Sequence, residues 1–281
     1  MTVPEKTFGL ALGGGGVRGL AHVPAYEAME ACGIRPSALT GTSMGAILGT
    51  LFASGASGRE VRAFVEENFA PRATGFRQFC ARQGALLKIA KSVTPSWGKT
   101  GLFKADRFLR YLTGQMGVSR FEDLEIPLRV VATDFHTGEA VVFDSGPLFP
   151  ALKASMAIPG AFVPLKHRGR ILVDGGMSNN LPYTELPDAC EVTIAVDVSP
   201  TREAEEGKAP NVLDATLGMF DILVDHQTKC MIRDNPPTVY FHPALTGIRV
   251  LEFDKIDEVF HQTERELEGF KARLEAVLAS G

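Results

Sequence analysis

A chain of 281 residues, 45% hydrophobic and 22% charged, is long enough for one large α/β domain and too apolar to be disordered. Its net charge of -4 excludes a predominantly basic nucleic-acid-binding surface. No run of 18 apolar residues occurs, so we expect no membrane-spanning helix and no more than peripheral lipid contact. The apolar stretch before the first glycines is too short for a signal-peptide core, and the four cysteines lack zinc-site spacing, which favours a cytoplasmic protein.

The first fifty residues alternate strand and helix signals. Residues 7–12 predict a short buried strand, which the glycine-rich segment Gly13–Gly19 ends. Apolar residues at helical spacing predict a helix over residues 20–31. A second short run, residues 38–40, leads into Gly41-Thr42-Ser43-Met44-Gly45 and a further helix. Two strands joined through a helix indicate a parallel sheet with right-handed crossovers.

The segment from about residue 59 to residue 126 differs in character, because no strong strand signal appears before Pro127. Between positions 71 and 120 lie ten basic residues and one acid, Asp106, interleaved with apolar side chains. One interpretation is a solvated helical insertion that packs its apolar face on the core. Another is a cap over the candidate site whose basic, aromatic surface contacts anionic lipid. We expect a helical cap insertion within a single domain of residues 1–281, since no linker divides the chain.

Strand and helix signals alternate again in the remaining chain. Runs typical of strands cover residues 128–134, 140–143, 170–173, 191–198 and 238–241. Helices are expected over residues 147–156, 212–232 and 256–278. The order of elements predicts an α/β fold, a three-layer αβα sandwich around a mostly parallel central sheet.

The pentapeptide around Ser43 fits the G-x-S-x-G pattern of a nucleophile elbow, where a serine occupies a strained turn between strand and helix. Gly41 and Gly45 supply the space and backbone freedom that such a turn requires. A plain structural turn has the same composition, so the pattern alone leaves both interpretations open.

The glycine-rich segment is compatible with more than one kind of site. Gly14–Gly19 fits the G-x-G-x-x-G pattern of dinucleotide binding, but the acid expected about 20 residues later is missing. A P-loop is excluded as well, because Gly98-Lys99-Thr100 lacks the upstream glycine and position 93 is Val.

An oxyanion hole is the remaining use of these glycines. The backbone N–H groups of Gly14, Gly15 and Gly16 would face a developing negative charge beside the serine, since both loops follow neighbouring strands. Arg18 would either brace this loop or bind a substrate anion, and the sequence does not choose between these roles.

A reactive serine needs a base. The chain has six histidines, but none lies in a small-residue loop at a strand end, and an α/β-hydrolase usually has several strands before its elbow. Asp174 does follow a strand, and Gly175 and Gly176 flank it, so we expect an exposed carboxylate that can approach Ser43. Asp-Gly-Gly is also common turn chemistry, so a purely structural role stays open.

Four blocks of the sequence resemble those of the patatin-like phospholipase family, in particular its bacterial members related to neuropathy target esterase. The blocks are Gly14–Gly19, Gly41–Gly45, Ala154–Pro159 and Asp174–Pro182, in the family's order, and the resemblance covers roughly residues 7–198. The resemblance implies a catalytic dyad of Ser43 and Asp174 without histidine, and an oxyanion hole formed by the glycine loop. It also implies hydrolysis of phospholipids or lysophospholipids without metal or cofactor.

Other functions would use the same fold. A general carboxylesterase or thioesterase acting on soluble acyl compounds would share the dyad, and a non-catalytic adaptor would keep the fold without reacting at Ser43. An acyltransferase resembling malonyl transferases would carry His at position 42, where Thr stands. We expect a lipid acyl hydrolase with no nucleic-acid partner and with peripheral contact to anionic lipid at the inner membrane face. The sequence predicts no oligomeric state.

Overall fold

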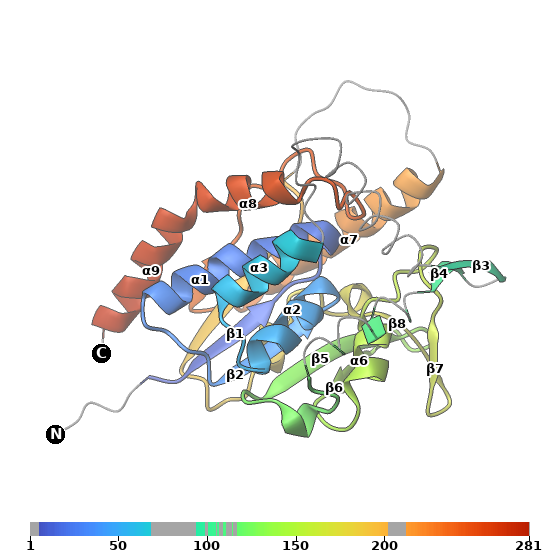
Figure 1. Ribbon diagram of the computed structural model, residues 1–281, viewed down its shortest axis with the longest axis horizontal. Helices are drawn as coiled ribbons and strands as arrows, with labels where there is room; N and C mark the ends of the chain where they lie inside the picture. The colour runs from blue at the N-terminus through green and yellow to red at the C-terminus, as the bar shows by residue number, and fades with distance from the viewer. Residues whose placement is uncertain are drawn as a thin grey trace.

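A mixed β-sheet forms the centre of the computed structural model (Figure 1). The structure describes residues 6–68, 94–98, 101–104, 106, 109–110, 114, 117–201 and 212–280. Its parallel strands are, in spatial order, β10 (Val239–Phe241), β9 (Val192–Val196), β1 (Phe8–Leu12), β2 (Ala38–Thr42) and β5 (Leu128–Asp134). The antiparallel strands are β6 (Ala140–Phe143), β7 (Leu165–His167) and β8 (Arg170–Asp174). The predicted mostly parallel sheet is therefore confirmed.

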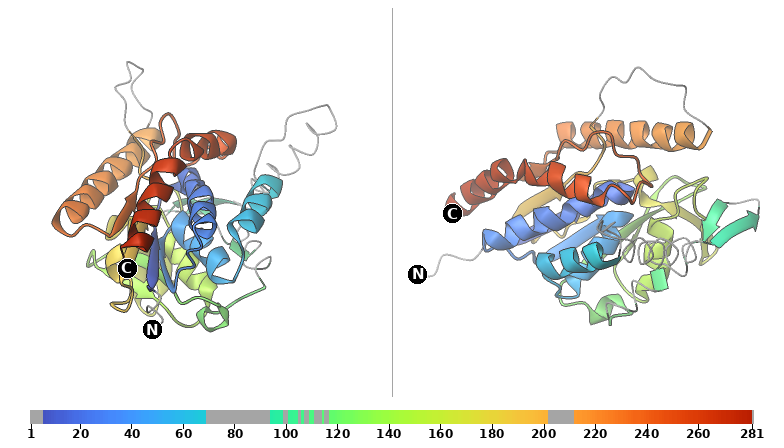
Figure 2. Two further views of the ribbon diagram at one scale, coloured as in Figure 1. Left: turned by 90° about the vertical axis from the view of Figure 1, so that its left-hand side faces the viewer. Right: turned by 45° about the horizontal axis from the view of Figure 1, so that its top comes forward.

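Alternate residues of the central strands face two layers of unequal size. Leu10 and Leu12 join the larger core, which is completed by helices α1 (His22–Ala31), α2 (Met44–Ala53), α3 (Gly58–Asn68), α6 (Leu148–Ser155), α8 (Ile256–Glu264) and α9 (Leu267–Ala279). Ala11 faces a smaller cluster under residues 181–190 and the C-terminal half of α7 (Val212–Asp234). In the left view of Figure 2, α7 in orange and α1 and α3 in blue and cyan lie on opposite sides. The expected three-layer αβα sandwich is thus confirmed.

The pairing of β5 positions the candidate site. One edge of β5 carries β6, and the other edge is shared by β2 and β8. Val131 pairs with Thr42, the last residue of β2, and the next residue, Ala132, pairs with Asp174, the last residue of β8. Because β8 runs antiparallel to β2, the C-terminal ends of the two strands meet.

Several elements differ from the sequence-based expectation. The strand at residues 140–143 is antiparallel to β5 instead of parallel, and β7 was not expected. The expected C-terminal helix is two helices, because α8 packs on the segment after the glycine loop whereas α9 packs on α1 and β10.

Much of the predicted cap, including residues 69–93, lies outside the described residues, so the cap stays a prediction. Its beginning, α3, packs Val61 and Val65 into the main core. Within the same region the strands β3 (Thr94–Gly98) and β4 (Gly101–Lys104) pair antiparallel, although no strand was expected there.

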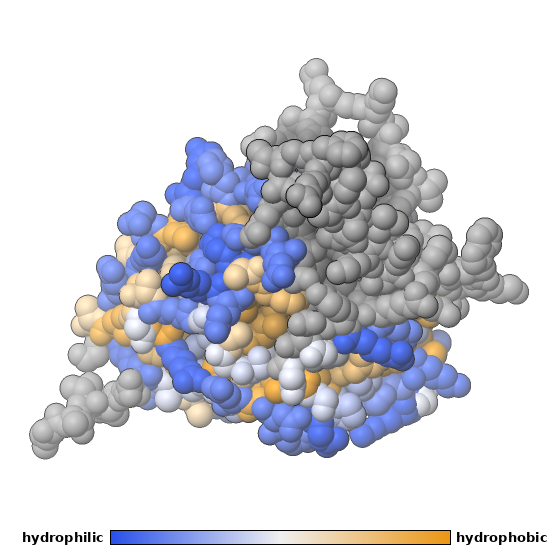
Figure 3. All heavy atoms as spheres, viewed as in Figure 1, coloured by the Kyte–Doolittle hydropathy of each residue, from blue (hydrophilic) through white to orange (hydrophobic). Residues whose placement is uncertain are grey.

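The ends of the described chain lie close together. The Lys6 Nζ donates a hydrogen bond of 2.6 Å to the Val277 carbonyl, and Figure 1 places both termini at the same end of the molecule. On the face shown in Figure 3, hydrophobic residues appear in small areas between hydrophilic ones. In the part of the chain that the structure describes, no helix is long and apolar enough to span a bilayer.

Candidate active site

Ser43 occupies a strained turn between β2 and α2. Its φ of 54° and ψ of -120° lie in a region that a residue with a side chain rarely adopts. The turn can form because Gly45 passes against the Leu12 carbonyl, where an added Cβ would collide with backbone. Gly41 is similarly confined, since its Cβ would lie 2.7 Å from the Ala46 Cα. Both positions need glycine because neighbouring backbone, that of Leu12 or of Ala46, leaves no room for a side chain.

Ser155, the last residue of α6, braces this turn. The Ser155 hydroxyl accepts a 2.8 Å hydrogen bond from the Ser43 N–H and donates a 2.6 Å hydrogen bond to the Val131 carbonyl. Ser155 is fully buried, so the two bonds leave its hydroxyl and the Ser43 N–H satisfied. The hydroxyl therefore links β5 to the strained residue.

Asp174 is buried rather than exposed, which corrects the expectation drawn from its glycine neighbours. Only 1% of the residue is accessible, and it ends β8, a strand that pairs with β5 and with β7. Burial raises the pKa of its carboxyl to about 7, although the Gly176 N–H and the Ser43 hydroxyl favour the ionised form. Oδ1 accepts the Gly176 N–H at 2.8 Å, whereas Oδ2 is buried and accepts no hydrogen bond of ordinary geometry.

Threonine hydroxyls attach the Asp-Gly-Gly segment to the sheet. Thr133 donates to the Asp174 carbonyl at 2.9 Å, and Thr42 donates to the Asn179 carbonyl at 2.8 Å. Gly175 lies against the Val131 carbonyl, where an added Cβ would collide. The carboxylate is thus carried on a backbone with little freedom to move.

The glycine loop meets Ser43 at the same end of the sheet, as the parallel pairing of β1 and β2 predicts. The Gly14 N–H donates to the Asn180 carbonyl at 3.1 Å, and the Asn180 side chain donates back to the Gly14 carbonyl at 3.1 Å. The Gly14 N–H is therefore engaged, contrary to the expectation that it faces an oxyanion.

The N–H groups of Gly15 and Gly16 are in no hydrogen bond among the described residues. Gly16 has a φ of 58° and lies against the Val250 carbonyl, so a side chain at this position would be doubly excluded. Of the three glycines, Gly15 and Gly16 keep unbonded N–H donors.

Arg18 braces the loop, which decides between the two roles left open by the sequence. Its guanidinium forms a bidentate pair with Asp221 of α7, with a shortest distance of 2.7 Å, and donates to the Val198 and Ile248 carbonyls. The arginine is 1% exposed, so its charge is matched inside the protein rather than presented to a substrate anion.

The histidines lie outside the cavity at Ser43. None of the six is among the residues that line the cavity at Ser43. His22 is buried under the glycine loop, where burial lowers its pKa to about 4 and its Nε2–H donates to the Gly13 carbonyl at 2.8 Å. His242 is held by the buried carboxylate of Asp197, 3.1 Å away. Neither is placed to take a proton from Ser43.

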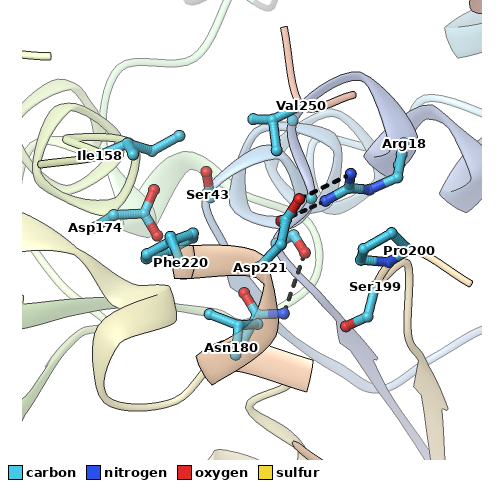
Figure 4. Close-up of a pocket in the computed structure, with 14 residues that line it drawn as sticks. Arg18, Ser43, Ile158, Asp174, Asn180, Ser199, Pro200, Phe220, Asp221 and Val250 are labelled. Carbon is cyan, nitrogen blue, oxygen red and sulfur yellow. Dashed lines mark hydrogen bonds and ion pairs between the residues drawn. The ribbon is translucent and has the colours of Figure 1, made fainter. Parts of the chain in front are cut away.

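The cavity at Ser43 is small. Its volume is about 10 Å³, roughly that of a single water position. Phe220, Asp221 and Val224 of α7 contribute to its lining, and Figure 4 shows Phe220 between Asp174 and Asp221. No group of three His, Cys, Asp or Glu side chains with metal-binding geometry occurs in the described parts of the chain.

A family model described as patatin-like phospholipase matches residues 10–187. The chain belongs to the patatin-like phospholipase family. The matched region contains the elbow, the glycine loop and Asp174, so the resemblance drawn from four short blocks is confirmed across most of the domain.

Curated relatives carry related names. An uncharacterized NTE family protein of Mycobacterium tuberculosis is 33% identical over 223 residues, which cover 76% of this chain and 57% of that protein. The lysophospholipase NTE1 of Saccharomyces cerevisiae is 25% identical over 283 residues, which cover 91% of this chain and 16% of that protein. The patatin-like chain thus spans little more than half of the first relative and a small part of the second.

A solved structure supports the fold. The crystal structure of VipD from Legionella pneumophila aligns with a TM-score of 0.50 and 13% identity, covering 95% of this chain and 67% of VipD. At this identity the likeness concerns the patatin-like architecture alone.

Two residues whose hydrogen bonds hold the elbow and the glycine loop were not singled out from the sequence. Ser155 and Asn180 lie inside the quoted blocks Ala154–Pro159 and Asp174–Pro182, which was the available signal. Their roles depend on partners 112 and 166 residues away, which no local pattern indicates.

Proposed function

We propose that this protein is a serine lipid acyl hydrolase, a carboxylic-ester hydrolase of the phospholipase A or lysophospholipase type. One observation carries the proposal: a serine on a strained elbow beside a buried carboxyl whose pKa is raised to about 7. A carboxyl with a pKa near neutrality is a far better general base than a free aspartate, whose pKa is about 3.9. The family membership supports a lipid ester as the substrate.

In the first step Asp174 accepts the proton of the Ser43 hydroxyl as its oxygen attacks the ester carbonyl. The free Oδ2 is the acceptor that the structure leaves available for this proton. Oδ2 accepts no hydrogen bond of ordinary geometry from Ser43, which is compatible with this role because catalytic hydrogen bonds often tighten only when substrate binds.

The tetrahedral intermediate then places negative charge on the former carbonyl oxygen. The N–H groups of Gly15 and Gly16 are the donors available to stabilise it, and losing one such donor typically costs about 2.7–4 kcal/mol in the chemical step. Protonated Asp174 returns its proton to the leaving alkoxide, and the acyl group stays on Ser43.

Water completes the reaction. Asp174 takes a proton from the attacking water, a second oxyanion forms and collapses, and the Ser43 oxygen leaves with the proton held by Asp174. The products are a fatty acid and the free enzyme, and no further co-reactant is consumed.

The test compares the wild-type protein with Ser43→Ala on phosphatidylcholine, lysophosphatidylcholine and short and long p-nitrophenyl esters. We expect Ser43→Ala to lower fatty-acid release at least about a thousandfold. Ser54→Ala is the matched control, since Ser54 caps the C-terminal end of α2 and its hydroxyl donates to the Leu51 carbonyl. Full activity of a folded Ser43→Ala protein would refute the proposal. Serine-dependent activity on soluble esters alone would make the protein a general carboxylesterase instead.

A further inference from the structure

One helix, α7, forms part of the wall of the candidate site, and we call it the roof. Helix α7 contributes three residues to the lining of the cavity at Ser43, namely Phe220, Asp221 and Val224. Binding sites for ligands of ordinary size occupy about 300 Å³ or more, whereas this cavity measures about 10 Å³. A substrate with an acyl chain therefore enters only if the roof shifts.

Specific contacts hold α7 in the closed position. Asp221 pairs with Arg18 at 2.7 Å, and the Gln227 side chain donates a 2.7 Å hydrogen bond to the Ser178 carbonyl just after Asp-Gly-Gly. Both contacts lie on the inner side of the helix, at the edge of the site. A shift of α7 would thus be transmitted to the glycine loop and to the segment carrying Asp174.

The outer side of the same helix is apolar. Met219, Ile222 and Leu223 are 58%, 51% and 58% exposed, and they account for three of the seven large hydrophobic residues exposed in the described chain. We name these three residues the outer stripe of α7. Met177, 45% exposed, lies on the short helix after Asp174 (Gly175–Met177), which contacts α7. Apolar side chains thus adjoin the site on the solvent side.

The charges around the outer stripe indicate what it would contact. The exposed residues from position 215 to position 226 include no Asp, Glu, Lys or Arg, and they recur at helical spacing. Toward the C-terminal end of the helix, Lys229 pairs with Asp225 at 2.7 Å and Arg233 pairs with Asp234 at 3.0 Å, so the charges described on this side of the stripe are balanced. An apolar stripe bordered by balanced charges matches the surface of a zwitterionic lipid bilayer, which has apolar depth and no net charge.

We propose that the outer stripe of α7 docks into the surface of a zwitterionic phospholipid bilayer and that this docking displaces α7 from the mouth of the site. The inference rests on the proposed lipid hydrolase function, and it adds the surface by which the enzyme meets its substrate. Binding by this route depends on apolar burial, so it is insensitive to salt and needs no anionic lipid. The basic segment considered from the sequence would give the opposite behaviour.

Docking is tested with the Ser43→Ala protein, which hydrolyses nothing in the proposed mechanism, by flotation with phosphatidylcholine vesicles. We expect co-flotation at low and at high salt. Adding Met219→Gln, Ile222→Gln and Leu223→Gln should weaken partitioning at least about tenfold. The matched control triple is Phe135→Gln, Val142→Gln and Leu278→Gln, whose residues are exposed on other elements, after β5, on β6 and on α9, and should leave flotation unchanged.

Three results would overturn docking by α7. These are flotation of the α7 triple variant like its parent, flotation that requires anionic lipid and is lost in salt, and a dimer that forms through the stripe without vesicle binding.

Displacement of the roof is read from the rate at which a fluorophosphonate labels Ser43. Vesicles should accelerate labelling of the wild-type protein and leave the α7 triple variant at its vesicle-free rate. Equal acceleration of both proteins would overturn the role of the helix. If Ser43 is never labelled but the protein floats as expected, the hydrolase function fails and the docking surface stands, so the two failures are distinguishable.

Discussion

The Asp174 carboxyl is the residue on which the proposed chemistry depends most. Its strand ends at the elbow, and its burial removes the water that would otherwise stabilise the charge. In the proposed mechanism, the burial that makes Asp174 a competent base also makes its ionised form costly to the fold. Catalysis and stability are therefore coupled through one side chain.

We predict opposite effects of Asp174→Asn on activity and stability. Burial raises the pKa of Asp174 to about 7 from an unfolded value near 3.8, so wild-type stability falls as pH rises between these values and stays low above them. Asparagine does not ionise, so at about pH 8 the free energy of unfolding of the variant should exceed that of wild type by on the order of a few kcal/mol. The gain should vanish below about pH 4.

Wild-type kcat/KM should rise about tenfold per pH unit below pH 7 and level off above it, because the base must be ionised. Asp174→Asn should be inactive throughout. Urea unfolding and ester hydrolysis across this range measure both effects, with Asp144→Asn, an exposed carboxylate, as the neutral control. A wild-type rate that does not depend on pH would contradict the assignment of Asp174 as base.

At the scale of elements, the end of α6 holds the turn between β2 and α2. Two hydrogen bonds of Ser155 join α6 to β5 and to the turn that carries Ser43. In the described chain, Ser43 and Arg168 are the only non-glycine residues with a positive φ. Strained backbone persists only where its surroundings hold it in place. The geometry of Ser43 is therefore a property of α6 as well as of the pentapeptide.

Ser155→Ala should lower kcat by about 10–100-fold, because the Ser43 N–H loses its partner and small displacements of a nucleophile are costly. The lost partner should also lower the free energy of unfolding by about 1–3 kcal/mol. Thr50→Val removes a buried hydroxyl on α2 that bonds the Ala46 carbonyl, and it should affect stability without changing kcat. Fluorophosphonate labelling and thermal melts separate the two effects. An unchanged kcat in Ser155→Ala would remove the bracing role.

At the scale of the molecule, the C-terminal helices complete the core that carries the site. Phe270 of α9 stacks on Phe241 of β10 with ring centroids 4.3 Å apart, and both belong to the cluster that includes Leu10 and Leu12. A shared core favours unfolding of the whole chain in one transition.

Phe270→Ala should lower the free energy of unfolding by about 3–5 kcal/mol while leaving kcat unchanged where the protein is folded. Circular dichroism and loss of Ser43 labelling should report the same midpoint. Leu278→Ala, on the exposed side of α9, should have little effect. Two separate transitions would show that the C-terminal helices are an independent unit, against the single domain expected from the sequence.

The sequence by itself determined the local elements and the identity of the reactive groups. The strand expected over residues 128–134 is β5, Leu128–Asp134, and the serine expected on a sharp turn has a φ of 54°. Such features depend on side-chain periodicity and on glycines within a few residues, which a short window contains. Asp174 could be named for the same reason, since its strand and its glycines adjoin it.

Only the tertiary structure decided how these groups act. The direction of β8 brings Asp174 to Ser43 and buries it, and Asn180 engages the Gly14 N–H and leaves Gly15 and Gly16 as donors. The position of α7 beside the site likewise depends on partners such as Arg18 and Asp221, 203 residues apart. Burial, pKa and hydrogen-bond partners are set by which distant segments share a strand edge, and a local pattern does not contain that information.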